Sequence, residues 1–382
     1  MTENRFALVF VIPDLRIGGA ERHATTLLRE LAARGHRVAV VCIEAGGPMA
    51  HGLDEAGVTV VELALGTGWK WRMLASLNRV ARALHRLAPD VVMTSGYSAE
   101  VLTRLTLRGR ADLPLLSWKH NIGHLGRFGI RDRLTERVLG RWVTRYLAVS
   151  YTQLGYLRSY LRLDPARIIV LRNAVAVAEQ VSDSERAAAR RELGVTPEQV
   201  VVGCVAVLRA EKDHANLIQA LALLPKQSAA VLVLVGEGPQ REKLADLARS
   251  NGVAESVCFL GTRADVLQLL TAFDVAVLAS HTVENLPYSA LEAMATGLPV
   301  VSTAVGAMAE LIDDGVTGWL VPPRSPAMLA DRLGRLVDDA GVRARMGEAA
   351  RARVTAGFQL AQLVSATERE VREVVRGGRD SG

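Results

Sequence analysis

Short apolar runs alternate with amphipathic segments through the first 150 residues. Runs with the length of a β-strand are FALVFVI (6–12), RVAVVCI (37–43), DVVMTS (90–95), PLLSW (114–118) and RYLAVS (145–150). Between the first two, apolar residues recur at helical spacing from Ala20 to Leu31. A strand, a helix and a second strand in this order predict a parallel sheet with helices on both faces. We therefore expect a doubly wound α/β domain.

The same alternation restarts after residue 180. Its apolar runs are rich in valine, as expected for strands that are covered on both faces: VVVGCVAVL (200–208), AAVLVLVG (229–236), VCFLG (257–261), VAVLAS (275–280) and PVVST (299–303). The chain has 382 residues, of which 49% are hydrophobic, so two separate cores are expected. We place the two domains at 1–178 and 179–356.

Charge divides unevenly between the halves. The chain carries a net charge of +6. Lys and Arg outnumber Asp and Glu in residues 1–175, whereas Asp and Glu outnumber Lys and Arg in the remainder. Aromatic residues make up only 4% of the chain and are not interleaved with the arginines, which argues against a nucleic-acid partner. Cys42, Cys204 and Cys258 stand singly in apolar runs, and the N-terminus lacks the pattern of a signal peptide. These features favour a cytoplasmic protein without a structural disulfide or metal site.

Two glutamates stand eight positions apart in HTVENLPYSALEAMATGLPVV, residues 281–301. Pro287 and Gly297 mark the limits of a predicted helix, so Glu284 precedes the helix and Glu292 lies within it. The stretch follows a predicted strand, and open α/β sheets bind ligands at the carboxyl ends of their strands. Carboxylates there accept hydrogen bonds from the paired hydroxyls of a ribose or hexose. The alternative is two solvated surface acids.

Candidate phosphate-binding groups occur in both halves. Gly18 and Gly19 lie in the first strand-to-helix turn, where the backbone can approach an anion. Arg209 and Lys212 follow the first strand of the second half and carry charges suited to a diphosphate. Gly236 follows another strand, in VGEGP. Tight turns and a solvated basic loop remain the alternatives, and the chain has neither a G-x-G-x-x-G nor a P-loop pattern.

Taken together, the motifs resemble those of the GT-B glycosyltransferases of family 4, which are retaining enzymes. The similar blocks occur in family order: GGAER, VGEGP, FLGTRADV, ENLPYSALEAMATGLPVV, AVGAMAELI and TGWLVP. The resemblance implies two Rossmann-like domains that face each other across a cleft. It also implies a nucleotide-sugar bound by the C-terminal domain, an acceptor bound mainly by the N-terminal domain, and a last helix, 357–376, that packs back onto the first domain.

The resemblance also implies roles for individual residues. Glu292 would hold the ribose and Glu284 the donor sugar, with Asn285 and Leu286 beside them and Gly236 also in the donor site. Arg209 and Lys212 would neutralise the diphosphate, Gly18 and Gly19 would bring the first-domain backbone to the donor, and His120 would lie against its sugar. Catalytic roles would fall to His120, Glu284, Lys212 and Arg209.

Three positions depart from the family pattern. Val207 stands where the family arginine is usual, so that Arg209 is a substitute two positions later. Asn285 replaces a common glycine, and the linker reads Asn-Ala-Val-Ala from Asn173 in place of Asn-Gly-Val-Asp.

The implied reaction moves a hexose from a UDP-sugar or GDP-sugar to a lipid-linked, saccharide or other acceptor, in cell-envelope, exopolysaccharide or glycolipid synthesis. We expect no cofactor, no metal and no protein nucleophile, because charge stabilisation of the leaving diphosphate supplies most of the catalysis. Alternatives are a sugar-nucleotide epimerase and a non-catalytic nucleotide-sugar-binding protein. An NAD-dependent oxidoreductase, with Glu44 on the ribose, is disfavoured by the missing glycine fingerprint.

Two basic segments suggest a further partner. Residues 68–87 combine Trp69 and Trp71 with arginines at helical spacing, and Arg133 begins a series in which every fourth residue to Arg145 is arginine. Arginines four apart repel each other on a helix unless an anion lies between them. The segments therefore suggest peripheral attachment to an anionic membrane surface. The alternative is a pair of solvated helices whose apolar sides pack on the sheet.

Overall fold

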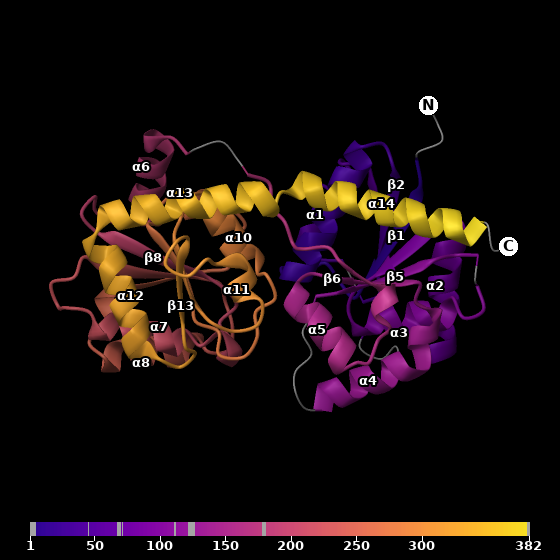
Figure 1. The fold of residues 1–382 in the computed structure, drawn as a ribbon, viewed down its shortest axis with the longest axis horizontal. Helices are drawn as coiled ribbons and strands as arrows, with labels where there is room; N and C mark the ends of the chain where they lie inside the picture. The colour runs from indigo at the N-terminus through magenta and orange to yellow at the C-terminus, as the bar shows by residue number, and fades with distance from the viewer. Residues whose placement is uncertain are drawn as a thin grey trace. The chain divides into compact units, whose positions relative to one another are not determined.

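A computed structural model describes residues 5–44, 46–66, 70, 72–110, 112–120, 127–177 and 181–379, without the side chains of 127–129, 378 and 379. It divides into two compact units. Unit 1 comprises Met1–Arg172 with Ala361–Gly382, and unit 2 comprises Asn173–Leu360 (Figure 1). The sequence pattern predicts these changes of domain after residues 178 and 356.

Unit 1 is a parallel sheet with helices packed against it. Within its described residues seven strands lie in the order β3-β2-β1-β4-β5-β6-β7. The strands are β1 (Ala7–Ile12), β2 (Arg37–Cys42), β3 (Val58–Glu62), β4 (Val91–Thr94), β5 (Leu115–Lys119), β6 (Arg145–Ala148) and β7 (Ile168–Val170). The helices are α1 (Gly19–Ala33), α2 (Met73–Leu87), α3 (Tyr97–Thr106), α4 (Arg127–Leu139), α5 (Tyr151–Ser159) and α14 (Leu360–Arg379).

Unit 2 repeats this architecture. Six strands in its described part lie in the order β10-β9-β8-β11-β12-β13, and every pair is parallel. The strands are β8 (Val200–Val205), β9 (Ala230–Val235), β10 (Val257–Gly261), β11 (Val275–Leu278), β12 (Val300–Thr303) and β13 (Gly318–Val321). The helices are α6 (Asp183–Glu192), α7 (His214–Leu223), α8 (Arg241–Ser250), α9 (Val266–Leu270), α10 (Tyr288–Ala295), α11 (Met308–Leu311), α12 (Pro326–Asp338) and α13 (Ala340–Gly357).

Burial on both faces explains the valine-rich runs of unit 2. Along β8, Val201 packs into one hydrophobic cluster, whereas Val202 and Cys204 pack into another. Along β9, Val233 and Leu234 divide between the same two clusters. Successive side chains of a strand point to opposite faces, so a strand with a core on each side needs apolar residues at every position. The predicted doubly wound α/β fold is confirmed for both units.

The last helix, α14, belongs to unit 1. Glu368 on this helix accepts hydrogen bonds from Arg34, at 3.0 Å, and from the ring of His36, at 2.8 Å. Farther along, Glu373 pairs with Arg145 of β6 at 2.8 Å. Just before α14, Gln359 of unit 2 forms a β-bridge with Val175. The helix expected at 357–376 therefore begins at Leu360, because residue 359 is held in extended pairing.

Strand order locates the ligand crevice of each unit. In unit 1 the order reverses between β1 and β4, and in unit 2 it reverses between β8 and β11. The connections after two such neighbouring strands run to opposite faces of the sheet, which opens a crevice at their carboxyl ends. The loops after β8 and β11 carry Lys212 and Glu284, and the turn after β1 carries Gly18.

Candidate functional site

A lysine–glutamate pair lies at the crevice of unit 2. Lys212 Nζ donates a hydrogen bond to Oε1 of Glu284 at 2.5 Å, across 72 positions of sequence. Ser280 at the end of β11 donates its hydroxyl to the same oxygen, and the hydroxyl of Thr303 donates to the Ser280 carbonyl. Glu284 is buried, whereas the Lys212 side chain keeps 28% of its surface exposed. The pair thus presents a partly exposed positive charge, oriented by a buried carboxylate, in the loops that follow β8 and β11.

The loop after β12 fixes the backbone of Glu284. Ala307 donates its amide to the Glu284 carbonyl at 2.8 Å. Gly306 has a φ of +57°, and a Cβ at this position would stand 2.0 Å from that carbonyl oxygen. Only glycine fits a contact this close in a left-handed conformation. The AVGAM stretch therefore positions Glu284, and the amide of Ala307 is already used by the protein.

Arg209 occupies a more open position than Lys212. It directly precedes the short 3₁₀ turn Ala210–Lys212, and its side chain is 63% exposed, 4.0 Å from the carboxylate of Glu211. The turn is tied to the other loop because His281 donates its amide to the Glu211 carbonyl at 3.1 Å. The two loops that carry the basic residues and Glu284 are therefore one connected structure.

The second glutamate lies on α10. Glu292 is only 4% exposed, so neither Glu284 nor Glu292 is a solvated surface acid. Between them Asn285 is half-buried and Leu286 is fully buried, with a φ of +51°. Asn173 donates its side-chain amide to the Leu286 carbonyl at 2.9 Å, which holds this strained position. Both glutamates and the residues between them thus form one rigid loop and helix start.

The candidate glycines differ in what surrounds them. Gly236 has a φ of +141°, and a Cβ there would stand 2.1 Å from the carbonyl oxygen of Ala206, so glycine is required for packing. Gly18 is extended, and a Cβ on it would meet the side chain of Glu21. A Cβ on Gly19 would meet no described atom within 4 Å. Space above the α1 N-terminus is therefore open at Gly19.

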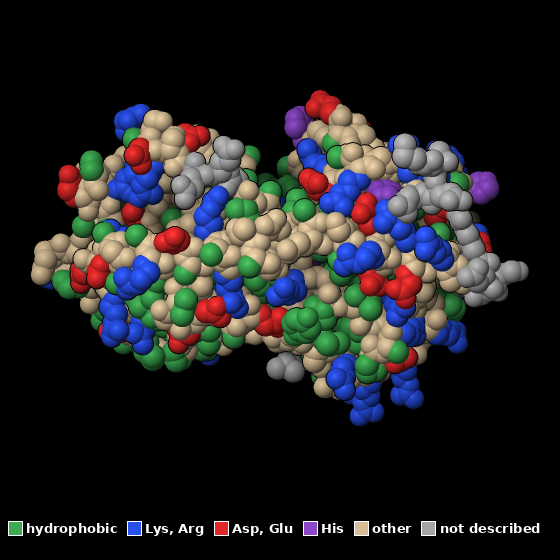
Figure 2. Space-filling model, turned by 45° about the horizontal axis from the view of Figure 1, so that its top comes forward, with side chains coloured by type: hydrophobic (Ala, Val, Ile, Leu, Met, Phe, Trp, Pro, Cys, Tyr) green, Lys and Arg blue, Asp and Glu red, His purple; other side chains and the backbone are tan. Residues whose placement is uncertain are grey.

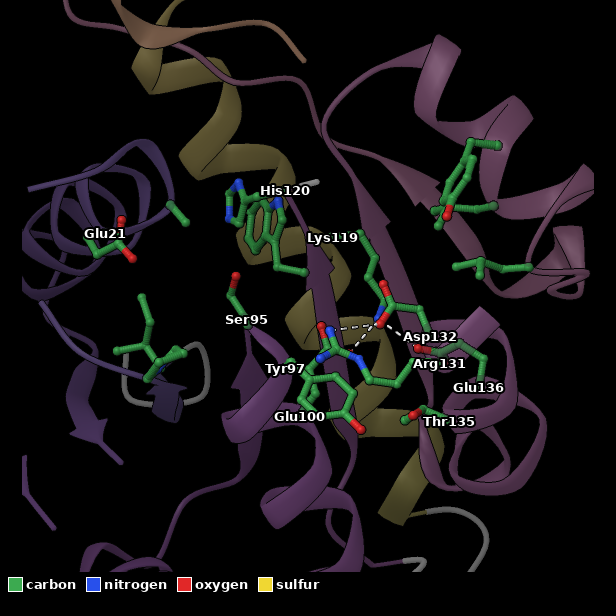
Figure 3. A pocket seen from close by; sticks show the side chains of 18 residues that line it. Glu21, Ser95, Tyr97, Glu100, Lys119, His120, Arg131, Asp132, Thr135 and Glu136 are labelled. Atoms are coloured by element: carbon green, nitrogen blue, oxygen red, sulfur yellow. Dashed lines mark hydrogen bonds and ion pairs between the residues drawn. The ribbon is translucent and has the colours of Figure 1, made fainter. Parts of the chain in front are cut away.

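Unit 1 contains a pocket of about 220 Å³ at the carboxyl ends of its central strands (Figure 3). His120, which follows β5, lines it together with Ser95, Tyr97 and residues of α4. The His120 ring lies 4.7 Å from that of His23, edge to face. Burial lowers the pKa of His120 to about 3, so this histidine is neutral at physiological pH.

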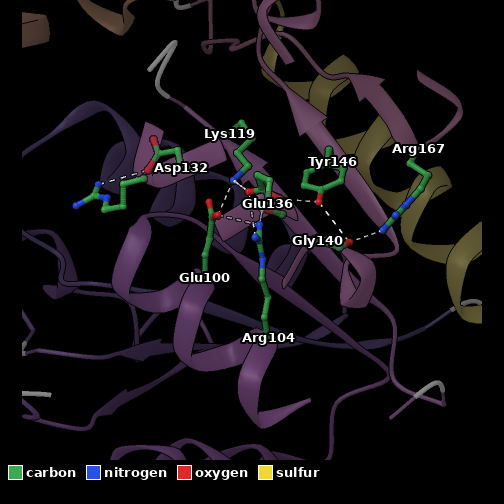
Figure 4. A network of polar contacts seen from close by, with 10 residues as sticks. Glu100, Arg104, Lys119, Asp132, Glu136, Gly140, Tyr146 and Arg167 are labelled. Carbon is green, nitrogen blue, oxygen red and sulfur yellow. Dashed lines mark hydrogen bonds and ion pairs between the residues drawn. The ribbon is translucent and has the colours of Figure 1, made fainter. Parts of the chain in front are cut away.

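A buried network of four charges forms part of the wall of this pocket, which its members Glu100, Lys119 and Glu136 line (Figure 4). Arg104 is fully buried and binds Glu100 at 2.9 Å and Glu136 at 3.0 Å. Lys119 binds the same two carboxylates at 2.5 and 2.7 Å. Tyr146 donates its hydroxyl to Glu136 at 2.7 Å. Burial would raise the pKa of Glu136, but Lys119 and Arg104 outweigh this effect and hold it at about 2.

The sequence pattern predicted neither this network nor the arginine that stacks on an aromatic ring in the pocket. The guanidinium of Arg131 lies 3.9 Å from the centre of the Tyr97 ring. A signal for the network was present in the sequence, because Glu100 and Arg104 stand four apart in an otherwise uncharged segment. Their partners Lys119 and Glu136 come from β5 and α4, and nothing in the sequence pattern connects these elements.

Family models match both halves of the chain. The model described as Glycosyltransferase Family 4 matches residues 17–179, and that described as Glycosyl transferases group 1 matches residues 185–353. A glycogen synthase of Mycobacterium tuberculosis is 30% identical over 399 aligned positions, which cover 96% of this chain and 94% of that protein. The chain belongs to the family 4 glycosyltransferases. The resemblance to family 4 glycosyltransferases that the motifs indicate is therefore confirmed, and the chain is a glycosyltransferase.

Other relatives of this glycosyltransferase carry different names. A D-inositol 3-phosphate glycosyltransferase of Kribbella flavida is 28% identical, with 87% of this chain and 85% of that protein covered. Among solved structures, Anabaena HepE in complex with UDP and glucose has a TM-score of 0.87 at 23% identity, covering 97% of this chain and 100% of that one. This likeness confirms the GT-B fold.

Two kinds of feature are absent from the described residues. No group of three or more His, Cys, Asp or Glu residues among them is arranged to hold a metal ion. No helix in the described part of the glycosyltransferase has the length and apolar character needed to cross a bilayer.

Proposed function

We propose that this glycosyltransferase moves a hexosyl group from a nucleoside-diphosphate-sugar to a lipid-linked or saccharide acceptor, with retention of anomeric configuration and without a metal. The observation that carries the proposal is the Lys212–Glu284 pair at the crevice of unit 2. One similar protein, Anabaena HepE, has been solved with UDP-glucose, which makes a UDP-sugar the first donor to test. Synthesis of an envelope polysaccharide or glycolipid suits such a reaction.

The basic residues would act on the leaving group. As the bond between the anomeric carbon and the diphosphate breaks, negative charge grows on the departing oxygen. Lys212, held by Glu284, would stabilise this charge from a fixed position, and Arg209 would add a second cation from its exposed loop. Two cations provide the positive charge that a divalent metal provides elsewhere, which is our reason for proposing metal independence.

The carboxylates would accept hydrogen bonds from the donor's hydroxyl groups. Glu292 would accept hydrogen bonds from the ribose, and Glu284 would border the sugar with Asn285 and Leu286. Gly236 would line the donor site, and the backbone at Gly18 and Gly19 would also contact the donor. The open space at Gly19 supports such an approach.

The pocket of unit 1 would receive the acceptor. Its lining combines hydroxyl groups of Ser95 and Thr135 with the charged groups of Arg131 and Asp132, which suits a hydroxyl-rich acceptor. Neutral His120 in its lining can accept or donate a hydrogen bond without adding charge, which suits a place beside the transferred sugar.

Thermal stabilisation by a panel of nucleotide-sugars tests the donor, because a ligand selective for the folded state raises the melting temperature. Radiolabelled donor, NMR of the product anomer and added EDTA then test the transfer, its stereochemistry and its metal independence. Label that stays on the nucleotide as an epimeric sugar would identify an epimerase. Binding without turnover, across a broad set of acceptors, would identify a sensor.

Glu292→Gln provides the site-specific arm of this test. We expect donor affinity to fall roughly tenfold to hundredfold, because a hydrogen bond to a charged group contributes about 1.5–3 kcal/mol. Glu255→Gln is the matched control, since Glu255 is an exposed glutamate of the same unit. Unchanged donor affinity in Glu292→Gln would remove Glu292 from the donor site.

A further inference from the structure

Helix α4 of unit 1 carries an apolar stripe on its solvent side. Ile130, Leu134 and Val138 are 61%, 58% and 55% exposed. Their spacing of four residues places all three on one face of the helix. An amphipathic surface helix normally turns such residues to the core. The alternative reading, in which the apolar side of this segment packs on the sheet, does not hold for these three residues, although Leu139 at the end of α4 is buried in the core.

Arginines interleave with this stripe. Arg133, Arg137 and the following Arg141 are all exposed, and within the described residues none of them lies within ion-pair distance of a carboxylate. Arginines four apart on one helix repel each other when no anion intervenes. Arg145, predicted as a fourth member of the series, lies instead on β6, where it binds Glu373. Arg141 lies in the 3₁₀ turn Gly140–Trp142 that follows α4, with its guanidinium 4.5 Å from the centre of the Trp142 ring. Three arginines without a carboxylate partner thus lie beside or just beyond the exposed apolar stripe.

Helix α2 extends the basic surface. Helices α2, α3 and α4 form a row along unit 1, with α3 between the other two (Figure 1). The exposed residues of α2 include Arg79, Arg82, Arg86 and Leu74, which is 79% exposed, and the helix contains no acidic residue. Figure 2 shows basic side chains projecting from the lower edge of unit 1. Trp69 and Trp71, also expected at this surface, lie outside the described residues.

We propose that the outer faces of α2 and α4 dock on a membrane surface rich in anionic phospholipid. Interfacial membrane helices lie along the membrane surface. They typically carry arginines beside exposed leucine, isoleucine and valine side chains. The arginines meet lipid phosphates while the apolar side chains enter the boundary between headgroups and acyl chains. A single-stranded nucleic acid would instead call for stacking aromatic residues among the cations.

The same helix connects this surface to the pocket. The inner side of α4 contributes Arg131, Asp132, Thr135 and Glu136 to the pocket lining, whereas its outer side carries the stripe. A helix with its side chains is about 10–12 Å across. A lipid-linked acceptor in the docked membrane would thus lie one helix diameter from the pocket. This last step rests on the proposed function, whereas the docking itself does not.

Co-sedimentation with vesicles of phosphatidylcholine, with and without phosphatidylglycerol, tests the docking. We expect binding only when phosphatidylglycerol is present, and weaker binding at high salt. The double variant Arg137→Glu and Arg141→Glu should bind about tenfold less or worse. Arg191→Glu with Arg345→Glu removes the same charge from exposed positions of unit 2 and should bind like the wild type.

The apolar contribution has its own variant. Leu134→Gln with Val138→Gln should weaken vesicle binding several-fold, because the stripe can no longer enter the headgroup boundary. Leu267→Gln with Val316→Gln is the matched control, since these residues are 53% and 56% exposed in unit 2. All four positions are at the surface, and unchanged thermal melts establish that the variants fold.

Three outcomes would overturn the proposal. One is equal binding to neutral and anionic vesicles, and another is binding that neither double variant changes. The third is a dimer in solution that the Leu134 and Val138 variant dissociates, with no vesicle binding by the wild type, since a second copy would then cover the stripe. Vesicle binding needs no donor, so failure of every nucleotide-sugar would refute the proposed function without affecting this result.

Discussion

The charged clusters of the two units are built in opposite ways. In unit 1, Arg104 and Lys119 share the carboxylates of Glu100 and Glu136, so that two positive charges meet two negative charges below the surface. Within the described part of unit 2, the buried Glu284 has Lys212 as its single ion-pair partner, and Lys212 retains contact with solvent. Arg209 beside it is mostly exposed.

This difference separates structural from functional charge. A fully paired buried cluster has little attraction left for a ligand, and its energetic importance appears when one member is removed. A cation that is oriented by a buried carboxylate and open to solvent can meet an anion without reorganisation. We therefore expect the network of unit 1 to govern stability and the pair of unit 2 to govern transfer.

The largest expected effect follows from replacing Arg104 with methionine. The substitution leaves two buried carboxylates to a single lysine, and breaking a buried ion pair in this way costs about 3–5 kcal/mol of unfolding free energy. Urea unfolding followed by tryptophan fluorescence measures it, because four of the five tryptophans belong to unit 1. Arg110→Met is the control, since its pair with Asp112 is exposed and should contribute at most about 1 kcal/mol. A loss no greater than that of the control would mean that the network is not structural.

Lys212→Ala should give the opposite profile. We expect kcat to fall by about 10²–10³-fold, as when one charge-stabilising donor is removed from an active site. The unfolding free energy should change less than in Arg104→Met, because the Lys212 side chain reaches solvent. Steady-state kinetics with the donor found in the panel measures the loss, with the exposed Lys226→Ala as control. Near-wild-type turnover would show that the Lys212–Glu284 pair does not govern transfer.

His120→Ala should have a smaller effect, which tests whether His120 lies beside the transferred sugar. Loss of one hydrogen bond to the transferred sugar predicts a roughly tenfold fall in kcat, with nucleotide affinity nearly unchanged. Because the pKa of His120 is about 3, this residue should add no ionisation to the pH dependence of kcat/KM between pH 5 and 8. An equal loss of nucleotide affinity in isothermal titration would contradict the placement beside the sugar.

The smallest effect concerns acid stability. The pKa of Glu136 is lowered from an ordinary 4.5 to about 2, so its ionised form stabilises the fold above pH 4.5. That contribution should disappear as the pH falls from 4.5 towards 2. Thermal melts between pH 3 and 6 should therefore show a steeper decline for the wild type than for Glu136→Gln. Parallel curves would show that Glu136 does not titrate as the network requires.

Much of the fold was predictable because parallel α/β sheets produce a strong local pattern of apolar residues in the sequence. The valine-rich runs predicted β8 to β12, since strands buried on both faces need apolar residues at every position. The edge strands β3 and β13 were missed. Residues of β3 are mostly half-exposed or exposed, and β13 is four residues long, so hydrogen bonds to a neighbouring strand define them more than their own sequence does.

The sequence by itself determined the motif blocks, the helix limits near Pro287 and Gly297, and the family. It left open whether Glu284 was solvated and which residue would pair with it. Pairing of β8 with β11 brings Lys212 to Glu284 across 72 positions, and the close packing of Gly306 fixes the carboxylate there. Local periodicity carries no information about contacts over such separations. The tertiary structure alone decided them, because strand order sets which loops meet at a crevice.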